Sequence, residues 1–153
     1  QCQVNGELFT LKYLKYGVPQ GSILGPLLFL IHINDLPNCL QHSTARMFAD
    51  DTKITVSGKS IREAGVAVNA DLNNIREWLL SNRLSRHNLV KTEYFLIGSR
   101  HNINTLEEQL RVLFSRDESI NGVQVTKTLG VKIDQFLSWD NHIDQISKKC
   151  LLE

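Results

Sequence analysis

The sequence lacks the signals of several protein classes. Its formal net charge is only +1 over 153 residues, so it has no general excess of Lys and Arg of the kind that marks many nucleic-acid-binding domains. Contacts with phosphates must therefore come from local clusters of cations, and we expect binding of nucleic acid by these residues alone to be weak.

Cysteine is scarce and widely spaced. The three cysteines form no C-x-x-C pair, which argues against a zinc knuckle or a disulfide framework and fits a reducing compartment. They are Cys2, Cys39 and Cys150. The histidines show no H-x-x-x-H spacing either, so no metal site of that kind is indicated.

A long hydrophobic run is also absent. The most apolar stretch, residues 23–33, is interrupted by Gly25-Pro26 and is too short to span a bilayer. We find no signal peptide, so we expect an intracellular protein without a membrane partner. Because the first residue is Gln1 rather than Met, we expect a fragment or a processed product.

The composition that remains is ordinary for a globular protein. The chain is 42% hydrophobic and 22% charged, and 153 residues are enough for one domain with a core or for part of a larger one.

Two adjacent carboxylates, Asp50 and Asp51, lie between two strand-like runs, residues 45–48 and 53–57. Adjacent carboxylates repel each other unless a cation joins them, and hard divalent cations such as Mg²⁺ prefer oxygen ligands. A hairpin that presents Asp-Asp at its tip is thus a candidate metal site for phosphoryl chemistry. The alternative is an exposed acidic turn, which is common.

Turn signals predict two further hairpins. One has arms at residues 3–4 and 8–13 around Asn5-Gly6, and the other has arms at 123–126 and 128–133 after a turn at Asn121-Gly122. Residues 93–97 should form a strand.

Three helices are predicted, and a fourth, shorter one is suggested. Residues 26–36, ended by Pro37, have almost no polar face and should be buried on most sides. Residues 60–82 begin with a capping box and carry apolar residues at steps of three or four, as in a helix packed over a sheet. Ser138 can cap a last helix, and Leu106, Leu110 and Leu113 suggest a short one.

Four segments, in this order, resemble the palm of a reverse transcriptase from a non-LTR retrotransposon, an RNA-directed DNA polymerase of a transposable element. They correspond to the family's motif B and its helix, motif C, motif D, and motif E with the start of the thumb. The segments are GVPQGSILGPLLF at 17–29 with INDLP at 33–37, FADD at 48–51, KTE at 91–93, and LGV at 129–131 with Asp134, Leu137 and Trp139. A lone Asp-Asp box is a weak signal, but the ordered set is specific and covers nearly the whole chain.

The resemblance implies a nucleotidyltransferase with two Mg²⁺ ions. Asp50 matches the family's metal ligand. Neighbouring residues on a strand point to opposite faces, so we assign Asp50 the direct catalytic role and Asp51 a peripheral one. A solvated or turn-stabilising Asp51 is an equal alternative.

Other roles follow from the same resemblance. Pro19, Gln20 and Gly21 match the loop that supports the incoming dNTP and template, although they could simply turn the chain into its helix. Lys91 is a candidate proton donor or charge partner for the leaving pyrophosphate, or else an exposed lysine in a basic loop.

Leu129 and Gly130 resemble the primer grip, the hairpin that holds the primer end. The alternative for Gly130 is an ordinary strand glycine at a bulge.

The expected fold is α+β. A small antiparallel sheet should carry the acidic hairpin, with helices 26–36 and 60–82 packed on one face and the other face left open as a cleft floor. Residues 1–137 would form a partial palm, and residues 138–153 the start of a thumb helix.

The resemblance also implies missing parts. We expect the motif A aspartate, the finger strands and most of the thumb to lie outside these 153 residues, since Asp35 does not match motif A. We therefore expect the residues to be inactive in isolation. Surface left bare by the missing parts should be apolar and prone to aggregation.

In a complete protein the partners would be an RNA template, a DNA primer and dNTPs, with nuclear localisation at integration. Two other functions remain open: a non-catalytic, retroelement-derived module that binds nucleic acid or protein, and a maturase-like RNA-binding protein.

Overall fold

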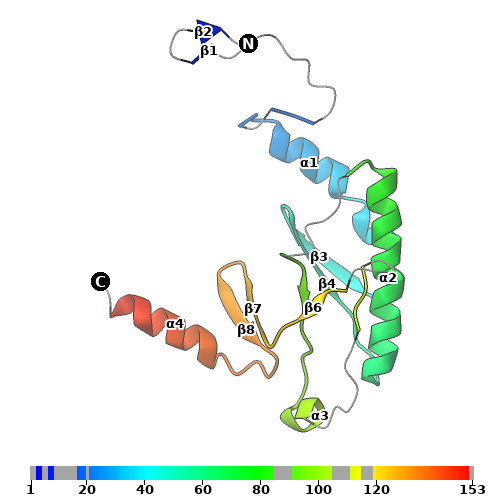
Figure 1. The fold of residues 1–153 in the computed structure, drawn as a ribbon, viewed down its shortest axis with the longest axis vertical. Coiled ribbons are helices and arrows are strands. Elements are labelled where there is room, and N and C mark those ends of the chain that lie inside the picture. The colour runs from blue at the N-terminus through cyan, green and yellow to red at the C-terminus, as the bar shows by residue number, and fades with distance from the viewer. Residues whose placement is uncertain are drawn as a thin grey trace.

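The computed structural model describes residues 3–4, 7–8, 17–19, 21–84, 91–104, 111–114 and 119–151. Helices and strands are mixed along the chain, which confirms an α+β composition (Figure 1). Within these residues the strands pair as four separate two-stranded units rather than as the single small sheet predicted.

The longest element is helix α2, Ile61–Ser81, as the sequence predicted. The Ser60 hydroxyl accepts a hydrogen bond from the Glu63 amide at 3.1 Å, and the Glu63 carboxylate accepts one from the Lys59 amide at 3.0 Å. These bonds satisfy backbone donors that a helix start leaves unpaired.

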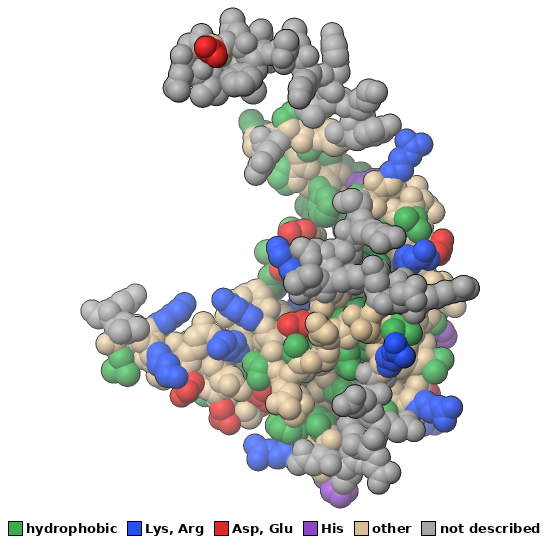
Figure 2. Space-filling model, viewed as in Figure 1, with side chains coloured by type: hydrophobic (Ala, Val, Ile, Leu, Met, Phe, Trp, Pro, Cys, Tyr) green, Lys and Arg blue, Asp and Glu red, His purple; other side chains and the backbone are tan. Residues whose placement is uncertain are grey.

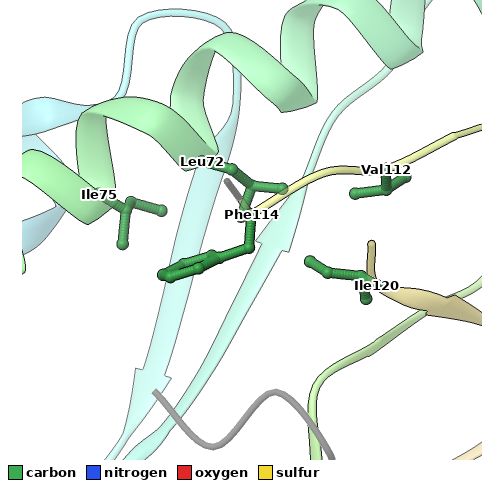
Figure 3. Packing of buried hydrophobic residues seen from close by; sticks show 5 residues of the cluster. All are labelled: Leu72, Ile75, Val112, Phe114 and Ile120. Carbon is green, nitrogen blue, oxygen red and sulfur yellow. The ribbon is translucent and has the colours of Figure 1, made fainter. Parts of the chain in front are cut away.

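The apolar face of α2 forms one side of the core. Figure 3 shows Leu72 and Ile75 reaching from the helix toward Phe114, with Val112 and Ile120 beside them. Ile54 and Tyr94 pack against the same cluster. The core therefore joins α2 to several segments that are distant in the sequence.

The acidic hairpin pairs β3 (Thr44–Phe48) with β4 (Asp51–Thr55) in antiparallel register. β4 begins two residues before the predicted residue 53, so that Asp51 belongs to the strand. Figure 1 shows α2 running alongside this hairpin.

The first apolar helix differs from its prediction. α1 spans Gly25–Ile33, and a separate 3₁₀ helix, η1, spans Leu36–Cys39 with Pro37 in its first turn. Pro37 therefore starts an element instead of ending one, which suits a residue without an N–H.

The prediction that this helix is buried on most sides is wrong for α1. Six of its nine residues are exposed, and only Gly25 and Ile33 are buried. The apolar composition predicts burial, but the described residues supply no layer that covers this helix.

The predicted turn at Asn121-Gly122 is wrong. These residues form strand β6 (Asn121–Gly122), which pairs in parallel with β5 (Glu93–Tyr94). β5 is also shorter than the predicted strand 93–97, and helix α3 follows at Arg100–Asn104.

Leu113 does not lie in a helix, because it forms an antiparallel bridge with Ser119. Leu106 and Leu110 lie outside the described residues. At the N-terminus, β1 (Gln3–Val4) pairs with β2 (Glu7–Leu8), while Asn5-Gly6 and residues 9–13 lie outside the description.

The C-terminal hairpin pairs β7 (Val125–Thr128) with β8 (Val131–Asp134) around a turn at Leu129-Gly130. α4 (Asp140–Cys150) then packs against β8. Its N-cap is Trp139 and not Ser138, and no side chain of the cap residue bonds to the helix. Among the described helices none is long and apolar enough to cross a membrane.

Candidate functional site

The acidic pair lies at the tip of the β3–β4 hairpin. Phe48 pairs with Asp51, so Ala49 and Asp50 alone form the turn. Ala49 has a φ of 51°, a left-handed conformation that strains any residue with a Cβ. The short turn brings two carboxylates to one exposed end of the hairpin.

The two carboxylates are not equivalent. Asp50 belongs to the turn, whereas Asp51 is the first residue of β4. On that strand successive side chains point to opposite faces of the hairpin. Both are exposed. In the described part of the chain, the ion pairs are Arg76–Glu77 and Lys148–Asp144, so neither tip carboxylate has a protein cation bound to it.

The hairpin has an inner and an outer face. Burial alternates along both strands, with Met47 and Ile54 among the half-buried residues of the inner face. The outer face presents Phe48 and Asp51 at the tip, followed by Arg46 opposite Lys53. The inner face attaches the tip to the core, and the outer face is free to meet a ligand.

A buried carboxylate anchors the base of the hairpin. Asp71 of α2 is fully buried and accepts hydrogen bonds from the amides of Gln41, His42 and Ser43 at 2.8, 3.0 and 2.7 Å. The Ser43 hydroxyl also donates to it at 2.5 Å. These residues lead directly into β3, so Asp71 ties the start of that strand to α2.

Asp71 remains ionised despite its burial. Desolvation alone would raise the pKa of this carboxyl, but the hydrogen bonds from Ser43, Gln41 and His42 outweigh it and lower the pKa below its ordinary value. The charge is therefore part of the folded structure.

The loop before α1 holds two of the predicted dNTP-binding residues, Pro19 and Gly21, while Gln20 lies outside the described residues. The Pro19 carbonyl accepts a hydrogen bond from the Ser22 amide at 3.0 Å, and Gly21 has a φ of 83°. That φ favours glycine, although open space surrounds the position of a Cβ. The turn geometry by itself accounts for Gly21.

Lys91 lies in the exposed segment just before β5. One hydrogen bond ties this strand to the C-terminal hairpin, because the Thr126 hydroxyl donates to the Glu93 carboxylate. A second ties it to the residues that precede β7, where the Val123 amide donates to the Tyr94 carbonyl at 2.8 Å. The structure thus joins the segment after Lys91 to the hairpin that carries Leu129 and Gly130.

Leu129 and Gly130 form a two-residue turn in which both φ angles are positive, 46° and 87°. A turn of this kind favours Asn-Gly, yet Leu129 occupies the first position and is 57% exposed. A strained, exposed leucine contributes little to stability. Such outliers are found preferentially at functional sites.

The tip partly fits a divalent cation. Two exposed carboxylates offer the hard oxygen donors that Mg²⁺ prefers. Within the described residues, however, no group of three His, Cys, Asp or Glu side chains could hold a metal ion. Asp50 and Asp51 would thus need a further ligand from outside this part of the chain.

The role of Asp71, which holds the base of the hairpin, was not predicted from the sequence. Its signal was an acidic residue directly before Leu72 on a helix whose apolar face was already evident. A carboxylate so close to an apolar stripe needs hydrogen-bond donors, and residues Gln41 to Ser43 supply them.

A second buried carboxylate explains how α4 begins. Asp134 accepts hydrogen bonds from the amides of Phe136, Ser138 and Trp139 and from the Ser138 hydroxyl. The bonds from Ser138 contribute most, and the pKa of Asp134 is lowered. Ser138 is thus a donor to Asp134 and not the helix cap.

Comparison with known proteins identifies the family. A family model described as reverse transcriptase (RNA-dependent DNA polymerase) matches residues 2–133. The RNA-directed DNA polymerase from mobile element jockey of Drosophila melanogaster is 26% identical over 152 residues, which cover 95% of this chain and 16% of the relative.

Two further relatives agree. The probable RNA-directed DNA polymerase from transposon BS of Drosophila melanogaster is 25% identical, with 91% of this chain and 16% of the relative covered. The jockey polymerase of Drosophila funebris is 28% identical, with 90% and 15% covered.

No solved structure matches. The chain spans about 16% of the length of the first curated relatives that it matches. With the family model covering most of its residues, this chain belongs to the reverse transcriptase (RNA-dependent DNA polymerase) family.

Proposed function

We propose that these residues form part of the nucleotide-adding site of an RNA-directed DNA polymerase, with Asp50 and Asp51 as its metal-binding carboxylates. The observation that carries the proposal is the two-residue turn, which presents both carboxylates at an exposed hairpin tip inside the segment matched by the family model. The substrates would be dNTPs, a primer and an RNA template.

Asp50 is the direct metal ligand because it lies in the turn, where its side chain does not have to point to one face of a strand. Asp51 contributes from the edge of β4. Two Mg²⁺ ions bound there would activate the attacking 3′-hydroxyl and stabilise the pyrophosphate leaving group. A further carboxylate from outside the described residues completes the site.

The remaining residues position the substrates. Pro19, Gln20 and Gly21 support the incoming nucleotide and the template, and Lys91 supplies a cation or a proton to the pyrophosphate. Leu129 and Gly130 hold the primer end. Residues 1–137 would then be palm and residues 138–153 the beginning of a thumb helix.

The 153 residues should be inactive alone. Two carboxylates on adjacent residues are fewer ligands than a two-metal site requires, and a ligand set this small binds Mg²⁺ poorly because the ion gives up its water reluctantly.

The test compares two proteins in primer extension on an RNA template with Mg²⁺ and dNTPs. We expect no extension by residues 1–153 and extension by a longer polymerase that contains them. Asp50→Asn should lower extension by the longer protein roughly 10²-fold or more, as expected for loss of an electrostatic stabiliser. Asp35→Asn, which also removes one exposed carboxylate, is the matched control.

The prediction that residues 1–153 are inactive would be refuted if they extended a primer and Asp50→Ala abolished that extension. Undiminished extension by the Asp50→Asn polymerase would refute the metal-site assignment. Nucleic-acid binding with no extension by any longer form would favour a non-catalytic module.

A further inference from the structure

The outer face of the β3–β4 hairpin carries a pair of like charges. Arg46 and Lys53 are directly opposite each other in the register of the hairpin, and both side chains are exposed. Directly opposed residues on antiparallel strands have Cβ atoms about 5 Å apart, and like charges there destabilise the pair. The arrangement therefore costs the isolated hairpin some stability.

No protein group compensates this charge in the described part of the chain. The ion pairs found there join Arg76 to Glu77 and Lys148 to Asp144. Asp51 shares the outer face with Lys53 but forms no ion pair with it. Two cations thus remain available to an external anion.

The neighbours of the pair favour a nucleic-acid strand over a small anion. Phe48, 66% exposed, lies beside the pair toward the tip, and Thr44 lies opposite Thr55 on the other side. An exposed aromatic ring can stack on a base, cations bind phosphates, and hydroxyls bond to the sugar–phosphate backbone. Successive side chains on this face of the hairpin are two residues apart along a strand, a distance of about 6.6 Å.

We propose that Arg46 and Lys53 bind the backbone phosphates of a nucleic-acid strand that lies along the outer face of the hairpin and ends near Asp50. The inference rests on the proposed function for the identity of its ligand. It adds a phosphate-binding pair to a chain whose net charge of +1 gives no general attraction to nucleic acid.

The experiment measures binding of residues 1–153 to a fluorescent DNA primer annealed to an RNA template, by fluorescence anisotropy in a chelator at several salt concentrations. The Arg46→Gln/Lys53→Gln variant should bind roughly tenfold more weakly at low salt. The slope of log K against log salt should fall by about 1.4 to 1.8 in magnitude, the value for two lost phosphate contacts.

Two controls separate this site from general charge. Lys59→Gln/Arg62→Gln removes the same charge from exposed residues at the start of α2 and should keep the wild-type slope. Arg46→Lys/Lys53→Arg preserves both charges and should bind like the wild type.

An unchanged slope in Arg46→Gln/Lys53→Gln, an equal loss in the Lys59→Gln/Arg62→Gln control, or the absence of any binding by the wild type would overturn the proposal. Because no metal is present in this assay, its failure leaves the primer-extension test of Asp50 unaffected, and the two proposals fail separately.

Discussion

Single carboxylates anchor two parts of this structure. Asp71 and Asp134 are buried, and each accepts hydrogen bonds from several backbone amides and one serine hydroxyl. Asp71 connects α2 to the base of the acidic hairpin, and Asp134 holds the turn that precedes α4. Hydrogen bonds to an ionised acceptor are stronger than neutral ones, so each side chain fixes a loop that has no regular structure of its own.

We predict that Asp71→Asn lowers the free energy of unfolding by about 3 kcal/mol, because an amide cannot accept all the donors that surround the carboxylate. Urea unfolding of residues 1–153, followed by circular dichroism, would measure the loss. Asp35→Asn is a control at an exposed site whose side chain forms no cap hydrogen bond with η1, and it should change the stability by less than about 0.5 kcal/mol.

The same carboxylate gives a pH dependence of known sign. Since the pKa of Asp71 is lowered in the folded state, its contribution is complete above the ordinary pKa of about 3.9 and disappears as the pH falls through the folded value. The difference in stability between wild type and Asp71→Asn should therefore shrink between pH 7 and pH 3. A constant difference over this range would contradict the prediction.

At the scale of elements, the two antiparallel hairpins that carry candidate site residues share one feature. Each turns through two residues, and each places a residue other than glycine in the left-handed region, Ala49 in one and Leu129 in the other. Such a conformation costs about 1–2 kcal/mol per residue. A fold selected for stability alone would place Asn or Gly there, which supports a functional role for both tips.

We predict that Leu129→Asn raises the free energy of unfolding by about 1 kcal/mol, since Asn tolerates the left-handed conformation that Leu129 adopts. The same denaturation experiment would detect the gain. Leu80→Asn, also at an exposed leucine but inside α2, should instead lower the stability by a few tenths of a kcal/mol. A loss of stability in Leu129→Asn would contradict the strain argument.

At the scale of the whole molecule, α1 stands apart from the core. Its leucines and isoleucine at positions 27, 28, 30 and 31 are each at least 49% exposed, and Figure 2 shows hydrophobic side chains gathered over this helix. The buried residues α1 does contribute lie at its ends, where Ile33 leads toward η1. Apolar surface of this kind promotes self-association.

We predict that residues 1–153 self-associate through α1 and that Leu27→Glu/Ile31→Glu reduces this, since the two residues lie one turn apart on the same side of the helix. Analytical ultracentrifugation would compare the variants at equal concentration. Val66→Glu, at a 68% exposed site on α2, is the control and should leave self-association unchanged. A monodisperse wild type with a sharp cooperative melt would refute the prediction.

Elements that are stabilised by interactions within a few residues were predicted from the sequence. α2 was predicted because a capping box and an apolar stripe both act within a few residues, and the acidic hairpin because strand-forming residues flank a turn. Asn121-Gly122 is a pair typical of turns, but it forms a strand because it pairs with Glu93-Tyr94. The pairing of distant residues overrode the local preference.

The sequence by itself determined the family, the α2 helix and the candidate residues Asp50 and Asp51, since all of these depend on the order and spacing of side chains. Only the tertiary structure decided that Asp50 forms the turn while Asp51 begins a strand, that Asp71 anchors the hairpin, and that α1 is exposed. Burial and hydrogen bonding are relations between segments distant in the chain, and a local pattern shows which residues need a partner but not which partner they find.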